Sequence, residues 1–211
     1  MYFLKRRHVM TVFGLTGPSG AGKAVVGCAF DARGIPVLDT DALYHSLIAG
    51  PSPCTSELCV AFGDVILSDV GGIDRKKLAA VVFCGGDLEK ERLSVLNRIT
   101  HRYVLAGCRS WLEKKKSEGM RAAVIDAPLL IEADFHTACD YVIAVLAPRE
   151  LRLSRIMARD GIGQAAAEAR ISAQKSDDFY RGYADFVFIN DGEITAAEDF
   201  ADRVIRAVFT P

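Results

Sequence analysis

A glycine-rich stretch that ends in a lysine carries the residue types that bind a phosphate group. Residues 17–24 read Gly-Pro-Ser-Gly-Ala-Gly-Lys-Ala, between an apolar run at 12–15 and a helical pattern that continues to Phe30. Strand, glycine-rich turn and helix is the context in which G-x-x-x-x-G-K indicates a phosphate-binding loop. The glycines let successive backbone N–H groups point at phosphate oxygens, and the helix presents its positive end to the same oxygens. Lys23 can then reach the β- and γ-phosphates of a nucleotide.

One position of this motif departs from the usual pattern. The loop normally ends in serine or threonine, whose hydroxyl coordinates Mg²⁺, whereas this chain has Ala24. Alanine cannot ligate a metal, so the sequence assigns no certain metal ligand. Mg²⁺ is expected to be held by the nucleotide phosphates and by water. The alternative of a glycine-rich turn without a ligand is disfavoured, because a bare turn has no use for Lys23.

Two carboxylates follow the next apolar run. The segment Val-Leu-Asp-Thr-Asp at 37–41 predicts a strand, and alternation along it would put Asp39 and Asp41 on the same side. They would lie at the carboxyl end of a parallel sheet, where ligands bind in open α/β folds. The alternative is a cap for a helix at 42–48, which Asp41 could supply. Capping and catalysis are compatible, and we expect two active-site carboxylates here.

Three further strands and a long helical block complete the predicted architecture. Strands are expected at 122–126, 141–146 and 186–189. Asp126 or Glu132, on either side of a proline-containing turn, could act on a ligand or cap the turn. From 56 to 118 the pattern is mostly helical, which is too long for a plain crossover and predicts an insertion that builds a second-substrate site. His101 lies in this block, and a packed or surface histidine is an equally weighted alternative.

A helix expected at 148–160 concentrates positive charge. Arg152, Arg155 and Arg159 are three and four residues apart and would share one face. A solvated face usually mixes charges of both signs, whereas this face is all arginine and therefore predicts phosphate binding. A second helix at 165–175 would complete an α-hairpin shaped like a lid, and a closing amphipathic helix is expected at 195–208.

The composition narrows the classes of function. The 211 residues carry a net charge of −1, and 50% of them are hydrophobic, as in a globular enzyme with no general affinity for nucleic acid or anionic membranes. No apolar run approaches the roughly 20 residues that a membrane helix needs. The basic segment at 5–8 as a nucleic-acid arm is a weaker alternative. Residues 1–9 are expected to be a disordered extension or an artefact of start-codon choice.

The six cysteines show neither C-x-x-C nor His-Cys ligand spacing. Several lie in apolar helical patterns, among them Cys28 and Cys108, and buried thiols behave as small hydrophobes. We therefore predict reduced, structural cysteines without a zinc site, in a cytoplasmic protein.

The span from about Thr11 to Val208 resembles dephospho-coenzyme A kinase through several motifs in the family's order. These motifs are the Asp-Thr-Asp of 39–41, the Pro-Leu-Leu-Ile-Glu of 128–132, the lid signature of 155–161 with Arg170, Ile171 and Gln174, and the last-strand signature of 184–192. The phosphate-binding loop alone looks as much like that of a guanylate kinase. The combination is specific to the family.

The resemblance implies an α/β P-loop kinase fold with a five-stranded parallel sheet flanked by helices, a helical substrate-binding insertion and an α-helical lid. The nucleotide-binding core would comprise residues 10–48, 120–147 and 183–211, the dephospho-CoA-binding insertion 49–119, and the lid 148–182. Such a kinase uses ATP and Mg²⁺ to phosphorylate the ribose 3′-hydroxyl of dephospho-CoA, the last step of coenzyme A biosynthesis. The partners would be these two small molecules, without nucleic acid or membrane, in a monomer or weak homo-oligomer.

The resemblance also implies roles for single residues. Asp41 would take the proton of the acceptor hydroxyl, Lys23 and the loop amides would cradle ATP, and Asn190 would flank the adenine. Arg155 and Arg159 would close over the phosphates. Residues expected at the ATP site are Gly17, Ser19, Gly20, Ala21, Gly22, Lys23, Ala24, Val25, Arg155, Arg159 and Asn190, and those expected to be catalytic are Asp41, Lys23 and Arg155. Residues expected to contact dephospho-CoA are Asp39, Asp41, His101, Pro128, Leu129, Leu130 and Glu132.

Three positions depart from the family's pattern. They are Ala24, Arg102 where proline is usual, and Tyr180 where a basic residue is usual, although Arg181 is adjacent. Ala24 decides between an active and an inactive protein. Water can replace a missing hydroxyl on Mg²⁺, so we expect a working kinase with altered Mg²⁺ affinity. The alternatives are a catalytically weakened or inactive nucleotide-binding protein of the same fold, and a kinase for another small nucleotide.

Overall fold

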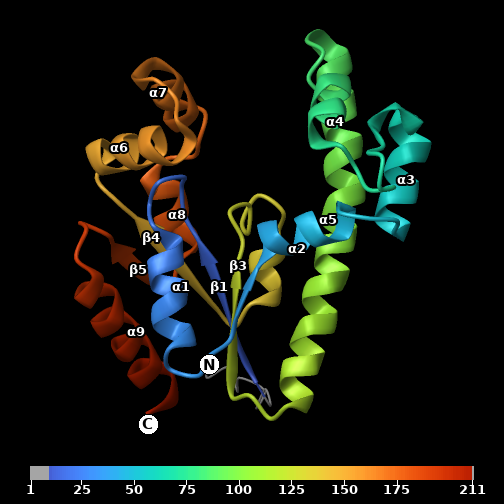
Figure 1. Ribbon diagram of the computed structural model, residues 1–211. Coiled ribbons are helices and arrows are strands. Elements are labelled where there is room, and N and C mark those ends of the chain that lie inside the picture. The colour runs from blue at the N-terminus through green and yellow to red at the C-terminus, as the bar shows by residue number, and fades with distance from the viewer. Residues whose placement is uncertain (1–9, 211) are drawn as a thin grey trace. The chain divides into compact units, whose positions relative to one another are not determined.

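The computed structural model describes residues 10–210 (Figure 1), so the extension expected at residues 1–9 lies outside the described residues. The chain divides into two compact units. The first combines the residues up to Leu38 with those from Lys114 onward, and the second comprises Asp39–Glu113. The first contains the sheet and the glycine-rich loop, and the second is mainly helical.

A five-stranded parallel sheet forms the centre of the fold, as predicted. Its strands are β1 (Thr11–Thr16), β2 (Val37–Asp39), β3 (Ala122–Asp126), β4 (Tyr141–Leu146) and β5 (Phe186–Ile189). The order is β2-β3-β1-β4-β5, so the strand that leads into the glycine-rich loop lies in the middle. Most residues of β1 and β4 are buried, which fits parallel strands covered on both faces. The last three strands have the bounds expected from the sequence.

Two helices lie side by side on one face of this sheet (Figure 1), namely α1 (Lys23–Asp31) and α9 (Ile194–Phe209). Phe30 of α1 packs on Phe13 of β1 with ring centroids 5.6 Å apart, inside a core to which α9 also contributes. The guanidinium of Arg33 pairs with the carboxylate of Asp202 at 2.6 Å. This contact ties the end of α1 to α9, so the helix that follows the loop is held at both of its ends.

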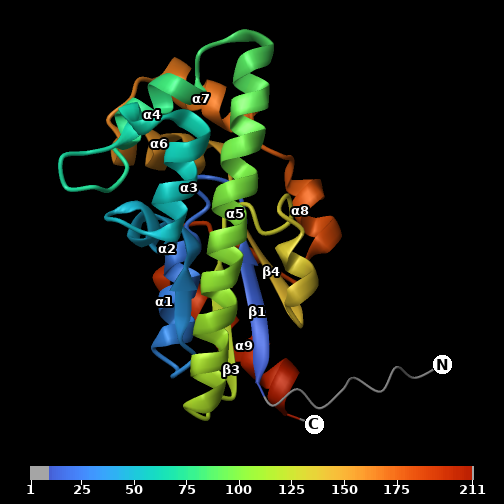
Figure 2. The ribbon, with the colours of Figure 1, turned by 90° about the vertical axis from the view of Figure 1, so that its right-hand side faces the viewer.

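Three helices follow β4, namely α6 (Arg149–Asp160), α7 (Gln164–Ser172) and α8 (Asp177–Tyr183). The first two form the helical hairpin that the sequence predicted, and its role as a lid stays a prediction. The second of them ends at Ser172 rather than at 175, because the hydroxyl of Ser176 accepts from the N–H of Phe179 and starts a new helix. This helix, α8, lies beside β4 (Figure 2), where Tyr180 is buried together with Leu146.

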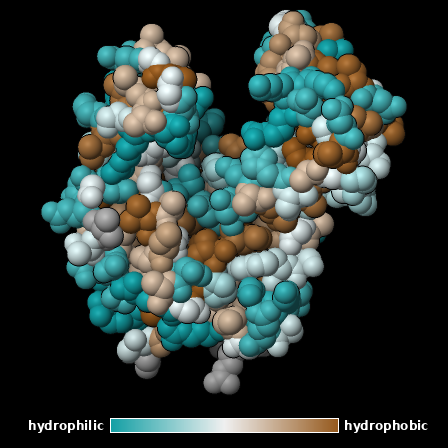
Figure 3. Space-filling view, viewed as in Figure 1, coloured by the Kyte–Doolittle hydropathy of each residue, from teal (hydrophilic) through white to brown (hydrophobic). Residues whose placement is uncertain are grey.

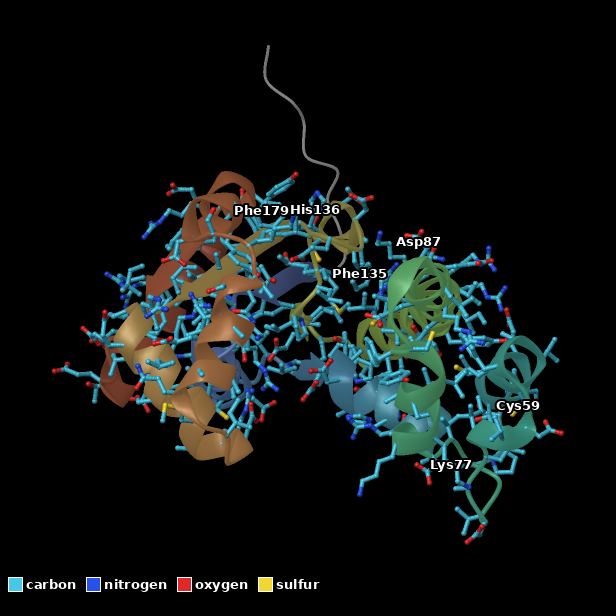
Figure 4. The ribbon with its side chains drawn as sticks, turned by 90° about the horizontal axis from the view of Figure 1, so that it is seen from above. Cys59, Lys77, Asp87, Phe135, His136 and Phe179 are labelled. Carbon is cyan, nitrogen blue, oxygen red and sulfur yellow. The ribbon has the colours of Figure 1, made fainter. Side chains whose placement is uncertain are left out.

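An aromatic cluster anchors α8 to the short 3₁₀ helix η2 (Phe135–Ala138). The ring centroid of Tyr183 lies 5.0 Å from that of His136 and 5.4 Å from that of Phe179. Figure 4 shows His136 and Phe179 as neighbours on this side of the sheet. Such ring pairs each contribute about 0.5–1.5 kcal/mol beyond the area that they bury. The end of α8 is thereby held in place.

The second unit packs several helices around a core of its own. Its elements are α2 (Thr40–Ile48), α3 (Pro53–Phe62), η1 (Asp64–Ile66), α4 (Arg75–Val82) and most of the long helix α5 (Gly86–Ser117), which Figure 2 shows along its length. Leu58 and Val82 are fully buried at the centre of this core. Val60, Val65 and Val70 are each more than half exposed, and hydrophobic side chains are visible on the surface of this unit (Figure 3).

The boundary of this unit differs from the one expected between residues 48 and 49. The helix α2 belongs to the second unit because its apolar side chains pack there. Ile48 is buried beside Leu58 in the core, and Leu43 lies so close to Gly107 of α5 that a Cβ there would be 3.0 Å from its side chain. The functional roles given to the core, insertion and lid stay predictions.

Arg102, one of the departures from the family's pattern, has a structural partner in the second unit. Its guanidinium pairs with the carboxylate of Glu57 and lies 4.9 Å from the ring centroid of Tyr103. The hydroxyl of Tyr103 donates to the same carboxylate at 2.9 Å. Arg102 therefore joins α5 to α3, which proline could not do.

The cysteines divide into three classes, and the half-buried class comprises Cys59 and Cys139. Cys54 and Cys108 are buried, whereas Cys28 and Cys84 are exposed. The prediction that Cys28 packs in the core is wrong, because the buried face of α1 is made by its neighbours Val26, Gly27, Ala29 and Phe30. Between residues 10 and 210, no helix combines the length and the apolar character that crossing a bilayer requires.

Brief alkylation of the native protein should modify Cys28 and Cys84 and leave Cys54 and Cys108 unmodified. Burial raises the pKa of Cys108 to about 11, so near neutral pH it carries little of the reactive thiolate. Peptide mass spectrometry after a pulse of iodoacetamide measures the pattern. The same pulse in denaturant should label all four, and native labelling of Cys108 as fast as that of Cys28 would contradict the burial.

Candidate active site

The glycine-rich loop joins β1 to α1 and depends on glycine at defined positions. Gly17, Gly20 and Gly22 have φ angles of 144°, 78° and 87°, a region that side chains disfavour. A Cβ at Gly17 would lie 2.1 Å from the carbonyl oxygen of Val145 in β4. Only glycine allows the loop to pass this close to the neighbouring strand. The predicted strand–loop–helix arrangement is confirmed.

Four amide groups of the loop are open to a ligand. The N–H groups of Gly20, Gly22, Lys23 and Ala24 donate to no acceptor within residues 10–210. They lie at the N-terminus of α1, where the helix dipole favours negative charge. The N–H of Val25 instead donates to the carbonyl of Gly22 at 3.1 Å. The arrangement is that of an anion-binding nest.

Lys23 and Ala24 begin α1. The ammonium of Lys23 donates to the carbonyl of Gly17 at 3.4 Å, which bends the lysine back over the loop. A cation held there can neutralise a phosphate bound to the open amides. Ala24 is exposed and offers neither a proton nor a metal ligand from its side chain.

Side chains from two other elements hold the carbonyl groups of the loop. Arg155 Nη1 donates to the carbonyls of Gly20 and Ala21 at 3.2 and 3.4 Å. Asn190 Nδ2 donates to Ala21 at 2.8 Å, and Arg152 Nε donates to Ser19 at 3.1 Å. Three consecutive carbonyls, from 19 to 21, are thus bound by α6 and by the residue that follows β5. Because these carbonyl oxygens already accept hydrogen bonds from side chains, the polar groups of the loop left for a ligand are the open N–H groups.

The three arginines on one face of α6 differ in burial and in their contacts. Arg155 is half-buried, Arg159 is exposed, and Arg159 Nη2 donates to Ser19 Oγ at 3.2 Å. Arg152 is 6% exposed, and besides the loop it contacts Asp177 at 3.7 Å. Burial lowers the pKa of the Arg152 guanidinium, and the Asp177 carboxylate raises it. The burial of Arg152 does not fit the prediction that it binds phosphate, whereas phosphate binding by Arg155 and Arg159 stays a prediction.

Asn190 braces the loop together with Arg155, since both donate to the carbonyl of Ala21. Its backbone N–H donates to Leu146 at 2.7 Å, which extends the pairing of β4 and β5. Its Oδ1 accepts from Arg155 Nη2 at 3.3 Å and from the N–H of Gly192 at 3.1 Å. Asn190 is buried, and both ends of its amide are occupied. Its expected place beside the adenine stays a prediction, and its contacts here are with the loop.

An acidic side chain ends the strand next to the loop. Asp126 of β3 is opposite Leu15 of β1, two residues before Gly17, and the N–H of Ala127 donates to Leu15 at 3.0 Å. Asp126 is half-buried. Among residues 10–210 no three His, Cys, Asp or Glu side chains converge in a way that would hold a metal ion. The part of the chain that the structure describes therefore offers carboxylate but no complete metal cage.

The proline-dileucine turn after β3 divides its residues between core and surface. The carbonyl of Pro128 accepts from Thr16 Oγ1 at 3.4 Å, Leu129 is half exposed, and Glu132 is exposed. Leu130 is fully buried and lies against Gly14. The expectation that Leu130 contacts dephospho-CoA does not fit this burial, because its side chain fills the core. The contacts with dephospho-CoA that were expected of the other residues of the turn stay predictions.

The two predicted carboxylates of the second unit have different surroundings. The strand β2 ends at Asp39, which caps α2: its Oδ1 accepts from the N–H groups of Asp41 and Ala42 at 2.8 and 3.1 Å. Asp41 lies in the first turn of α2 and is exposed. The prediction that both extend from one strand is wrong, because the cap of Asp39 starts the helix before Asp41.

His101 lies within α5 in the second unit and is half-buried. Burial lowers its pKa below the ordinary value, so its imidazole favours the neutral form. A packed histidine and a substrate contact are both compatible with this position. Its predicted contact with dephospho-CoA stays untested.

One residue of the site has a contact that the sequence did not predict. Gln174, after α7, accepts from the N–H of Ser19 at 3.2 Å and from Arg152 Nη2 at 2.6 Å. Gln174 is the last position of the lid signature in the sequence. The signature indicates that this residue is important, but it does not indicate which residue it contacts. The partner is 155 positions earlier in the chain.

Comparisons with known proteins agree on one family. A family model described as dephospho-CoA kinase matches residues 11–196. A dephospho-CoA kinase of Anaeromyxobacter dehalogenans is 37% identical over 196 residues, which cover 93% of this chain and 91% of the relative.

Solved structures give the same picture. One described as TT1252 from Thermus thermophilus has a TM-score of 0.78 at 30% identity and covers 96% of this chain and 99% of its own. The dephospho-CoA kinase from Campylobacter jejuni has a TM-score of 0.69 at 25% identity, covering 93% and 96%. The similarity extends over the loop, the lid and the last strand, which confirms the predicted α/β P-loop kinase fold. The chain therefore belongs to the dephospho-CoA kinase family.

Proposed function

We propose that this protein transfers the γ-phosphoryl group of ATP to the ribose 3′-hydroxyl of dephospho-CoA, forming coenzyme A and ADP in the last step of coenzyme A biosynthesis. Family membership supports the reaction. The observation that carries it is the set of open amides at Gly20, Gly22, Lys23 and Ala24 beneath a bent-back lysine. Phosphoryl transfer requires mainly positioning and neutralisation of charge, which these groups supply.

The ATP phosphates lie along the open amides in this proposal. Lys23 exchanges its contact with the Gly17 carbonyl for the β- and γ-phosphate oxygens. Arg155 and Arg159 already lie on the loop through its carbonyls and through Ser19 Oγ, so small side-chain rotations bring their guanidinium groups to the phosphates. The adenine lies near the residues that follow β5.

Mg²⁺ would neutralise the charge of the ATP phosphates when bound. The residues present fit this arrangement only in part, because Ala24 offers no ligand and no complete metal cage exists among residues 10–210. Asp126, beside the strand that leads into the loop, orients water toward the phosphates. Mg²⁺ binds largely through phosphate and water in such kinases, so the loss of one hydroxyl lowers affinity without abolishing it.

Asp41 is the base that accepts the proton of the 3′-hydroxyl. Both carboxylates are exposed, but they are not equivalent, since Asp39 Oδ1 is used in capping α2. The assignment of the base to Asp41 also follows the family resemblance. His101, Leu129 and Glu132 contribute to binding dephospho-CoA. We place the enzyme in the cytoplasm as a monomer or weak homo-oligomer that does not bind nucleic acid.

Replacing the proposed base tests the assignment of Asp41. Asp41→Asn should lower kcat by a factor of about 10²–10⁴, the usual contribution of a general base, with little change in KM for ATP. Coupled detection of ADP release under saturating substrates measures kcat. Asp87→Asn, an exposed carboxylate of the second unit labelled in Figure 4, is the matched control. A kcat for Asp41→Asn within threefold of the parent would remove Asp41 from the mechanism.

Restoring the missing hydroxyl tests the role of Ala24. Ala24→Ser should lower the Mg²⁺ concentration for half-maximal turnover by about tenfold, because the serine hydroxyl can ligate the metal. The measurement is an Mg²⁺ titration of ADP release with ATP and dephospho-CoA, with Ala32→Ser at the end of the same helix as control.

The outcomes separate the alternatives. Turnover that appears only in Ala24→Ser would identify a lapsed kinase. Absence of turnover in both proteins at saturating Mg²⁺ would exclude the proposed reaction, and a panel of small nucleotides would then search for another acceptor.

A further inference from the structure

We propose that Gln174 is a positioning residue for ATP binding, which fixes the tip of the phosphate-binding loop through Ser19 and the buried Arg152. Its side-chain oxygen accepts from the N–H of Ser19 at 3.2 Å and from Arg152 Nη2 at 2.6 Å. The side-chain oxygen of Gln174 thus connects Ser19 with the guanidinium of Arg152, which itself donates to the Ser19 carbonyl. The inference rests on the loop being the ATP site, as proposed above.

Ser19 is held by the lid through each of its polar groups. Its N–H donates to Gln174 Oε1, its carbonyl accepts from Arg152 Nε at 3.1 Å, and its Oγ accepts from Arg159 Nη2 at 3.2 Å. The next two carbonyls accept from Arg155. Ser19 is therefore the point at which the lid determines the course of the loop. The open amides of the nest begin at the following residue, Gly20.

Arg152 needs Gln174 because it is buried. A guanidinium that is 6% exposed has lost its water and must be compensated by protein acceptors. Its acceptors are the Ser19 carbonyl, Gln174 Oε1 and the Asp177 carboxylate at 3.7 Å. Removing the shortest of these contacts leaves part of the cation unpaired, so its bond to the Ser19 carbonyl weakens as well.

The support behind Gln174 is rigid. It lies between α7 and α8, and its own N–H donates to the carbonyl of Ile171 at 3.1 Å. The following helix starts at a Ser176 cap and is anchored by Tyr180, which is 3% exposed. The backbone on both sides of Gln174 is thus held by hydrogen bonds and by a buried side chain. Gln174 itself is half-exposed, so the chain should tolerate replacements there.

A change at Gln174 should affect the Kd and KM for ATP and not those for dephospho-CoA. A loop tip that is no longer fixed must be ordered when ATP binds, and this cost falls on nucleotide affinity. Gln174→Met, which keeps the length of the side chain and removes the acceptor, should raise Kd and KM for ATP by about tenfold. KM for dephospho-CoA should stay within twofold of that of the parent. Gln174→Glu keeps an acceptor for both donors and should retain most of the parent's ATP affinity.

Isothermal titration with ATP and initial-rate kinetics on the full chain test the proposal. Gln164→Met is the matched control, because the amide of Gln164 contacts only Glu168 on the surface of the lid among the bonds of the described chain. Circular dichroism and thermal midpoints confirm that each variant folds. Weaker ATP binding in Gln174→Met together with recovery in Gln174→Glu supports the proposal.

Three results would overturn it. They are a Gln174→Met variant that binds ATP like the parent, equal losses in the Met and Glu variants, and an equal loss in the Gln164→Met control. Failure of the proposed function gives a different signature, since the parent itself would then bind no ATP or release no ADP. The two failures are thus distinguished by the parent protein alone.

Discussion

The hydrogen bonds that three side chains donate to consecutive carbonyls of the loop are the constraint on which the site depends. Arg152, Arg155 and Asn190 bind the carbonyls of residues 19–21. A peptide whose carbonyl is fixed has its N–H fixed too, because the peptide group is planar. The outer contacts therefore determine where the inner N–H groups point. A phosphate-binding nest is made here by groups that do not touch the phosphate.

These contacts bring together parts of the chain that are far apart in sequence. The sheet makes this possible, since β1 lies beside β4 and β4 beside β5, so the ends of these strands meet at one edge. The loop leaves β1, α6 starts after β4, and Asn190 follows β5. Each connection is short and rigid, and the arginines of α6 reach the loop without a flexible linker. A chain with a net charge of −1 thereby gathers cations at one place.

The elements with strong local signals could be predicted from the sequence. The loop, the apolar strands at 141–146 and 186–189 and the lid hairpin follow from glycine spacing and hydrophobic runs, which report on the backbone nearby. Asp41 was misplaced because the strand ends at Asp39, whose side chain caps α2 and starts the helix two residues earlier than the strand pattern predicted. Cys28 was misplaced because its apolar neighbours do not specify which face of α1 is buried.

The partners of polar side chains could not be predicted in the same way. Arg152 and Arg155 are alike in sequence, yet one is buried with Asp177 and the other reaches Ala21. The difference depends on which way α6 faces, and this is a property of the tertiary packing. The bonds of Gln174 likewise join residues that no local pattern relates. The order of the motifs indicated that these positions are important. Only the fold shows which residues they contact.

The close approach at Gly22 has a consequence for how this sequence can change. A Cβ on Gly22 would lie 2.1 Å from Asn190 Nδ2, the atom that donates to Ala21. The absence of a side chain at one position is thus what admits the amide at the other. The two positions form an epistatic pair: a side chain at 22 would require a shorter residue at 190, which forfeits the brace, and it would still be strained by the φ angle of 87°. The residue at each position therefore limits which substitutions are tolerated at the other, although most of the chain lies between them.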